Sequence, residues 1–119
     1  MLTSVLLVDD DVAFRDLARR MLGEMGLAVV GEAGTVAAAA AAAAELRPDA
    51  ALVDIGLPDG DGFALTRQLA ALPWTVRIVL TSSDPDAATP DSVRSAGAVG
   101  FVAKDELPSG WVRELLIGD

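Results

Sequence analysis

The chain contains no cysteine, no histidine and no tyrosine, and phenylalanine and tryptophan together make up only 4% of it. Without cysteine, neither a disulfide framework nor a thiolate metal site is possible, and a reducing cytoplasm is the expected location. Without histidine, the commonest general base is missing. Any acid–base or nucleophilic chemistry must therefore use aspartate, glutamate, serine, threonine or the single lysine, Lys104.

Positive charge is also scarce, since 9 lysine and arginine residues face 18 aspartate and glutamate residues, for a formal net charge of −9. Phosphate backbones need basic side chains, so we expect no direct binding of nucleic acid by this chain. No apolar run approaches the roughly 18 residues of a membrane span, and no cationic segment precedes the first apolar run. We expect no membrane association, and 119 residues suit one domain over 1–119.

Apolar runs alternate with segments of helical periodicity along the whole chain. The predicted strands cover 4–8, 27–31, 50–54, 76–81 and 99–103. The predicted helices cover 12–23, 35–46, 62–71, 90–96 and 108–117. Short strands that alternate with helices predict an α/β fold with a parallel sheet and helices on both faces.

Two helices have distinctive patterns. In the first, a stripe at helical spacing predicts a core-facing side, made of Phe14, Leu17, Ala18, Met21 and Leu22. The second contains eight consecutive alanines at 37–44. Thr35 as an N-cap before this run, and Pro48 after it, indicate an ordinary helix rather than a low-complexity segment.

Polar residues stand where four of the predicted strands end. Asp9 and Asp10 follow the first strand, and Asp54 ends the third. Thr81 ends the fourth strand, and Lys104 comes just after the fifth. Because ligands of open parallel sheets bind outside the carboxyl ends of the strands, these residues predict one polar site.

This set of groups matches the needs of phosphoryl transfer. Mg²⁺ takes one or two carboxylates together with phosphate, which Asp9, Asp10 and Asp54 can supply. Asp54 can then attack phosphorus and form an aspartyl-phosphate. Thr81 and Lys104 can offset the charge of the phosphoryl oxygens.

Each residue also has a purely structural interpretation. Acids before a helix often serve as N-caps, which is what we expect of Asp11 and which stays open for Asp9 and Asp10 taken alone. Asp54 can simply end a strand, and Lys104 can be a solvated surface lysine. The coincidence of four strand ends, each with a group that a phosphoryl site needs, favours the functional interpretation.

Four segments together resemble the receiver domain of two-component response regulators. They are LLVDDD at 6–11, PDAALVDIGLPDGDG at 48–62, IVLTSSD at 78–84 and AGAVGFVAKDELP at 96–108. The last segment is most similar to receivers of NarL/FixJ-type regulators. The resemblance implies a CheY-like, flavodoxin-like doubly wound sheet of five parallel strands in the order 2-1-3-4-5, with helices on both faces.

The resemblance also implies roles by position. Asp54 matches the phospho-acceptor of the family. Asp9, Asp10 and the backbone carbonyl of Gly56 match, with Asp54, the ligands of Mg²⁺.

Three further residues match the part of the family site that responds to phosphorylation. Thr81 matches the switch hydroxyl, and Lys104 matches the lysine that contacts the phosphoryl group. Phe101 stands at the switch aromatic position, where many members carry tyrosine, so a hydroxyl contact is lost there.

The implied function is a phosphorylation-dependent signalling switch, not an enzyme except in assisting its own phosphorylation and dephosphorylation. A histidine kinase or a phosphotransfer protein would be the phosphoryl donor. The face made by the fourth helix, the fifth strand and the fifth helix would change and meet a second copy or an output domain. The chain is either a stand-alone receiver or the excised receiver of a DNA-binding transcription regulator.

Two rival functions stay open. A small Mg²⁺ phosphohydrolase of the haloacid-dehalogenase kind also uses an aspartyl nucleophile, and 9–11 formally contains its DxD motif. That rival leaves Asp54 unexplained, and 119 residues leave no room for a cap domain. The other rival is a pseudo-receiver, which binds partners without being phosphorylated.

Overall fold

The computed structural model describes residues 2–118 and has a central sheet of five parallel strands. The strands are β1 (Ser4–Val8), β2 (Ala28–Ala33), β3 (Ala50–Asp54), β6 (Arg77–Ser82) and β7 (Gly100–Ala103). They lie in the order β2-β1-β3-β6-β7, and each neighbouring pair is parallel. This is the order 2-1-3-4-5 expected for a flavodoxin-like doubly wound sheet, so the predicted fold class is confirmed.

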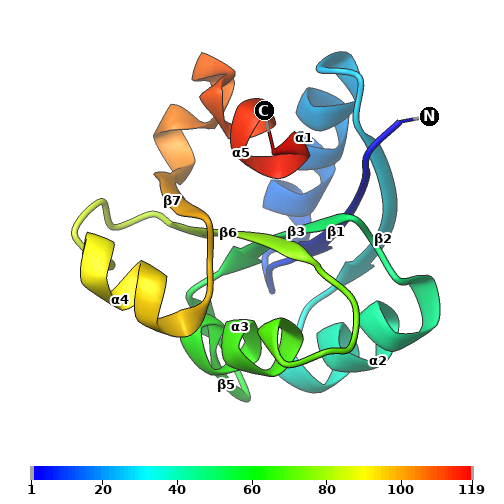
Figure 1. Cartoon of the computed structure of the whole chain (residues 1–119). Helices are drawn as coiled ribbons and strands as arrows, with labels where there is room; N and C mark the ends of the chain where they lie inside the picture. Colours follow the sequence, from blue (N-terminus) through cyan, green and yellow to red (C-terminus); the bar gives the residue numbers. More distant parts are fainter. Residues whose placement is uncertain (1, 119) are drawn as a thin grey trace.

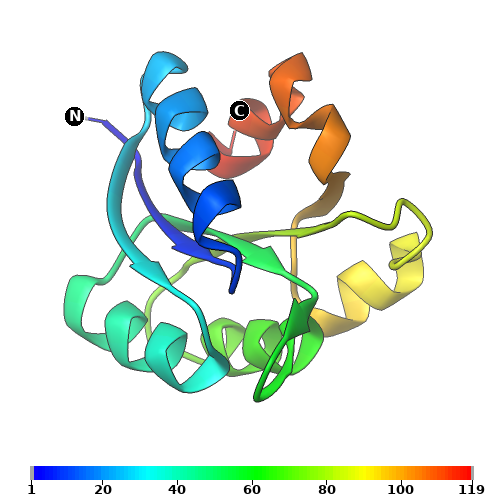
Figure 2. The same cartoon turned by 180° about the vertical axis from the view of Figure 1, so that it is seen from behind.

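Helices cover both faces of the sheet (Figures 1 and 2). One face carries α1 (Val12–Glu24) and α5 (Trp111–Ile117). The other face carries α2 (Val36–Leu46), α3 (Gly62–Ala70) and α4 (Pro90–Ala96). Within residues 2–118, no helix combines the length and the apolar character needed to span a bilayer.

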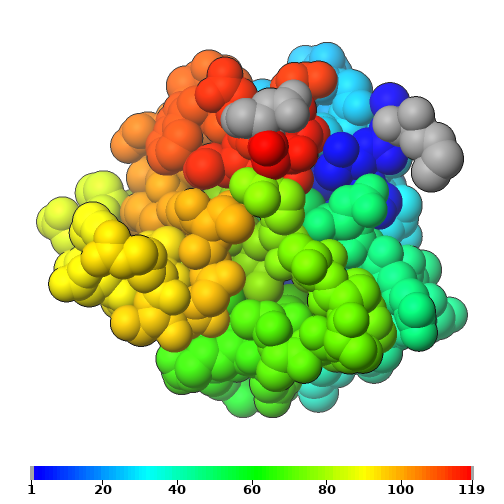
Figure 3. All heavy atoms as spheres, viewed as in Figure 1, coloured from blue at the N-terminus to red at the C-terminus, as the bar shows by residue number. Residues whose placement is uncertain are grey.

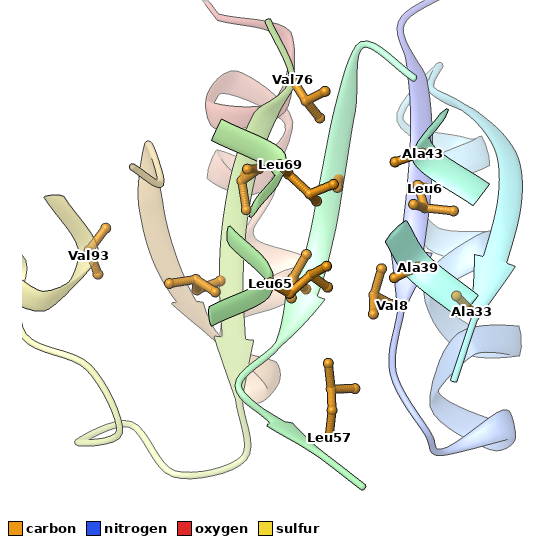
Figure 4. Close-up of a cluster of buried hydrophobic side chains, with 14 residues drawn as sticks. Leu6, Val8, Ala33, Ala39, Ala43, Leu57, Leu65, Leu69, Val76 and Val93 are labelled. Carbon is orange, nitrogen blue, oxygen red and sulfur yellow. The ribbon is translucent and has the colours of Figure 1, made fainter. Parts of the chain in front are cut away.

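The two faces of the sheet bury two separate apolar clusters. In β1, Val5 and Leu7 pack toward α1 and α5, whereas Leu6 and Val8 pack toward α2 and α3. Successive side chains of a strand point to opposite faces, so one continuous apolar run serves both cores. Figure 4 shows the second cluster, with side chains of α2 and α3 directed at β1 and its neighbours.

The alanine run forms the predicted helix, α2. Thr35 is its N-cap, and the Thr35 hydroxyl accepts a hydrogen bond from the backbone N–H of Ala38 at 3.0 Å. Ala39 and Ala43 are completely buried against the sheet. The helix ends as Arg47 adopts a left-handed backbone with a φ of 45°, just before the proline.

The predicted stripe of α1 is only partly correct. Ala18 and Leu22 are completely buried, as expected. Leu17 is 50% exposed, so its assignment to the core was wrong. Phe14 is partly buried and also contacts a polar residue, Lys104.

Two short elements differ from the predicted ones. Between β3 and α3 the chain forms an antiparallel hairpin of β4 (Gly56–Leu57) and β5 (Gly60–Asp61), where only a turn was expected. Between β7 and α5 lies a 3-10 helix, η1 (Lys104–Ser109), so the last helix starts at Trp111 and not at 108. Pro108 lies inside η1, and Gly110 has a φ of 91°, a backbone that ends η1 before α5 begins.

Candidate functional site

Polar residues from the ends of β1, β3 and β7 meet at the carboxyl edge of the sheet. Asp9 follows β1, and Asp54 is the last residue of β3, the strand beside it. One carboxylate oxygen from each of Asp9, Asp10 and Asp54 lies within 4.8 Å of the others. Lys104 reaches Asp9 and Asp54 from the end of β7. The strand order therefore brings together groups that are far apart in the sequence.

Asp9 is the most enclosed of the three acids, with 1% of the residue exposed, whereas Asp10 is exposed. Its Oδ1 accepts a hydrogen bond from the backbone N–H of Asp11 at 2.9 Å. Its Oδ2 forms an ion pair with Lys104 Nζ at 2.6 Å. Both carboxylate oxygens of this buried acid therefore have a partner.

The main chain of Asp9 is held from two sides. Its N–H donates to the carbonyl of Ala33 at the end of β2, at 2.9 Å. Its carbonyl accepts from Arg15 Nη1 at 2.5 Å, and Arg15 Nε donates to Glu32 at 2.9 Å. Arg15 thus links α1 and β2 to the acidic loop. The sequence analysis missed it, because an arginine on a helix has no distinctive spacing.

Asp54 and Lys104 form the electrostatic centre of the site. Burial of Asp54 raises the pKa of its carboxyl, nearby Asp9 raises it further, and Lys104 offsets part of the rise. Lys104 Nζ lies 3.5 Å from Asp54 Oδ2. Burial alone would lower the pKa of Lys104, but its contacts with Asp9 and Asp54 outweigh burial and raise it. The ammonium therefore stays charged beside the acids.

This set of donors fits a hard divalent cation. Three carboxylates against one ammonium leave the cluster with an excess of negative charge, which a cation would offset. Oxygen ligands are those that Mg²⁺ prefers. Gly56 lies beside the cluster, since its N–H donates to Asp54 Oδ1 at 3.3 Å. Apart from its chain neighbours, no atom of residues 2–118 lies within 4 Å of where its Cβ would be, so that side of the backbone is open.

The hairpin folds tightly behind Asp54. The N–H of Gly62 donates to the carbonyl of Ile55 at 2.7 Å. A Cβ on Gly62 would lie 2.5 Å from the Asp54 carbonyl oxygen and 2.8 Å from Ile55 Cα. Only glycine allows the two backbone segments to come so close, so Gly62 helps to fix the backbone that carries the Asp54 side chain.

Asp59, in the turn of the hairpin, is a second residue that the sequence analysis missed. Its carboxylate accepts hydrogen bonds from the N–H groups of Val36 at 2.7 Å and Ala37 at 3.1 Å. These two bonds lower the pKa of Asp59. The hairpin is therefore attached to the N-terminus of α2, a contact between residues that sequence spacing does not relate.

Thr81 is completely buried one strand away from Asp54, with which it pairs in the sheet. Its hydroxyl donates to the carbonyl of Val102 in β7 at 2.6 Å. Phe101, the residue before Val102, is half-buried and lines a hollow of about 370 Å³ between α4 and β7. Figure 3 shows the surface of α4 and β7, yellow and orange, on the side turned to the viewer. Thr81 thus links the site to this surface.

Comparison with known proteins identifies the family of this chain. The family model of the response regulator receiver domain matches residues 5–113. The chain is 43% identical over 106 residues to the DNA-binding transcriptional activator DevR/DosR of Mycobacterium tuberculosis, covering 87% of this chain and 48% of that protein. The chain spans about half the length of the first curated relatives that it matches.

Two solved structures are similar over almost the whole chain. One is a LuxR-family two-component response regulator from Aurantimonas, with 30% identity, a TM-score of 0.88 and coverage of 99% of this chain and 87% of that one. The other is the BeF3-activated receiver domain of Klebsiella pneumoniae RstA, with 31% identity, a TM-score of 0.81 and coverage of 96% of each chain. The resemblance found in the sequence is confirmed, and the chain belongs to the response regulator receiver domains, the signalling domains of two-component systems.

Proposed function

We propose that this receiver domain is a phosphorylation switch whose phospho-acceptor is Asp54. The observation that carries the proposal is that Asp54 lies close to both the acidic pair and Lys104. Its Oδ2 lies 3.5 Å from Lys104 Nζ, and its Oδ1 accepts from the N–H of Gly56. A histidine kinase or a phosphotransfer protein would supply the phosphoryl group.

Asp9, Asp10, Asp54 and the backbone carbonyl of Gly56 would hold Mg²⁺. When bound, the ion would offset the charge of the acids and of the incoming phosphoryl oxygens. The excess negative charge of the cluster supports this assignment.

Asp54 and Lys104 would carry out the transfer of the phosphoryl group. A carboxylate oxygen of Asp54 attacks the phosphorus of a phosphohistidine, so a P–O bond forms as the P–N bond breaks. The electron pair of the broken bond stays on the donor imidazole, which takes up a proton. The Lys104 ammonium stabilises the charge on the phosphoryl oxygens, because it already lies beside Asp54.

The switch would begin at Thr81. Its hydroxyl, which donates to Val102 in this structure, would turn to a phosphoryl oxygen. Val102 would then lose a hydrogen bond, and the neighbouring Phe101 would shift in the hollow between α4 and β7. A local change of charge would in this way alter the α4–β7–α5 surface.

That surface would contact a second copy or an output domain. The similarity to DevR/DosR, described as a DNA-binding transcriptional activator, supports an output domain in a transcription regulator. The receiver itself, with a formal net charge of −9, would not contact nucleic acid.

Intact mass after incubation with Mg²⁺ and acetyl phosphate tests the acceptor. We expect one phosphoryl group on the wild type and on Asp86→Asn, a control that removes one exposed charge in the loop before α4. We expect none on Asp54→Asn, and none on the wild type in the presence of EDTA. No adduct on any form would instead favour a pseudo-receiver, and continued release of phosphate from phosphate esters would favour a phosphohydrolase.

A further inference from the structure

The face of an aromatic ring supports the lysine of the site. Lys104 Nζ lies 4.2 Å from the centroid of the Phe14 ring, within the range of a cation–π attraction. We propose that Phe14 is a positioning residue, whose ring holds the Lys104 ammonium in place beside Asp54. This inference rests on the proposed function of Asp54.

Three partners lie close to the ammonium. Asp9 Oδ2 lies 2.6 Å from it, Asp54 Oδ2 lies 3.5 Å from it, and the Phe14 ring covers it as well. Only 17% of the Lys104 side chain is exposed. Since a cation–π attraction grows as water is excluded, this pair is stronger than one on an open surface.

The ring is the one neutral partner among the three. The attraction of Lys104 to the carboxylates of Asp9 and Asp54 falls when a divalent cation offsets the charge of these acids. The attraction to Phe14 changes little, because the ring carries no net charge. Phe14 therefore keeps the ammonium in reach of the phosphoryl oxygens at the stage when the acids hold it least.

Lysine needs such support more than most residues. Its four-carbon stem is flexible, and fixing it costs side-chain entropy. A lysine that is already held loses less freedom when it binds the phosphoryl group, so the affinity of the site is higher.

The start of α1 places the ring. Asp11 caps this helix by accepting from the N–H groups of Ala13 at 3.0 Å and Phe14 at 3.3 Å. The N–H of Asp11 in turn donates to Asp9 Oδ1. The segment that positions the acidic pair thus also positions the ring, so acids and ring keep a constant relation to Lys104.

The first test reads the contact without any phosphorylation. Lys104 is the only lysine, so the proton NMR signal of its ε-methylene group is the only lysine signal of that kind. We expect the Phe14 ring current to shift it upfield in the wild type, and Phe14→Leu to return it to the value of a free lysine. An unshifted signal in the wild type would overturn the proposal.

The second test separates the cation–π attraction from packing. Fluorinated phenylalanines with increasing fluorine content, placed at position 14, weaken the negative face of the ring but keep its shape. The readout is the affinity for beryllofluoride, a phosphoryl mimic, with Mg²⁺ present. We expect a graded loss that reaches roughly fivefold to tenfold, the size of a partly desolvated cation–π pair.

The same series at Phe63 is the matched control, because that ring packs in the cluster on the other face of the sheet. If the affinity for beryllofluoride does not change with fluorination at position 14, or if it falls equally with fluorination at position 63, the positioning role is refuted. Failure of the unmodified protein to bind beryllofluoride would remove the proposed function and this role together. The NMR signal would still show separately whether the ring contacts Lys104.

Discussion

Replacing Asp54 by asparagine should stabilise the fold in the absence of divalent cations. The side chain keeps its shape but loses its charge, and with it the repulsion from Asp9 and Asp10. Burial and Asp9 already raise the pKa of Asp54, which means that the site disfavours its ionised form despite Lys104. The variant removes that unfavourable charge.

The size of the effect follows from the distances. At 4.8 Å, the upper limit of the separations among the three carboxylate oxygens, and an effective dielectric constant of about 20, each pair of carboxylates repels by about 3.5 kcal/mol. The attraction between the Asp54 carboxylate and Lys104 at 3.5 Å offsets about 4.7 kcal/mol of this repulsion. Two repulsive pairs therefore exceed the attraction by about 2 kcal/mol, and solvent around exposed Asp10 reduces this to about 1–2 kcal/mol. For a chain of this size we expect Tm to rise by about 4–8 °C.

Thermal and urea unfolding, followed by circular dichroism in EDTA and then in Mg²⁺, measure the effect. Mg²⁺ at about 100 times its Kd should stabilise the wild type by about 2.7 kcal/mol. Asp54→Asn lacks one ligand and should gain less, so the order of stability should reverse when Mg²⁺ is added. Asp86→Asn should follow the wild type in both conditions. Our reasoning is refuted if Asp54→Asn is no more stable than the wild type in EDTA.

Gly62→Ala should lower the free energy of unfolding by about 2–3 kcal/mol in urea, because its Cβ would meet backbone atoms of Asp54 and Ile55 that cannot move aside. Gly56→Ala, where space is open, should change it little in EDTA, and equal losses would contradict this account. Hydrogen bonds from Arg19, and then from Arg15, hold the pKa of Glu32 below its ordinary value of 4.5. The ionised Glu32 carboxylate thus stabilises the fold fully at a pH above 4.5, and this stabilisation is lost as the pH falls through the lowered pKa. Glu32→Gln should cost about 1 kcal/mol at neutral pH, and this gap to the wild type should close in acid. A gap that stays constant with pH would show that the loss is not electrostatic.

The sequence by itself was enough to predict the alternating strands and helices, because apolar periodicity and helix caps act over a few residues. The alanine run became α2 at the expected place, since a threonine cap and a left-handed residue before proline are local devices. The polar residues at the strand ends could also be recognised in the sequence, because an acid directly after a buried strand must lie at the edge of the sheet. Their convergence needed the strand order, which the family resemblance supplied.

Other features were decided only by the tertiary structure. The strands of the hairpin at β4 and β5 are two residues long, too short to show a period in sequence. Leu17 has the spacing of a core residue, yet half of it stays exposed to solvent. The contacts of Arg15 with Asp9, and of Phe14 with Lys104, join side chains from separate elements. Which long side chains meet depends on how helices pack on the sheet, and no local pattern encodes that packing.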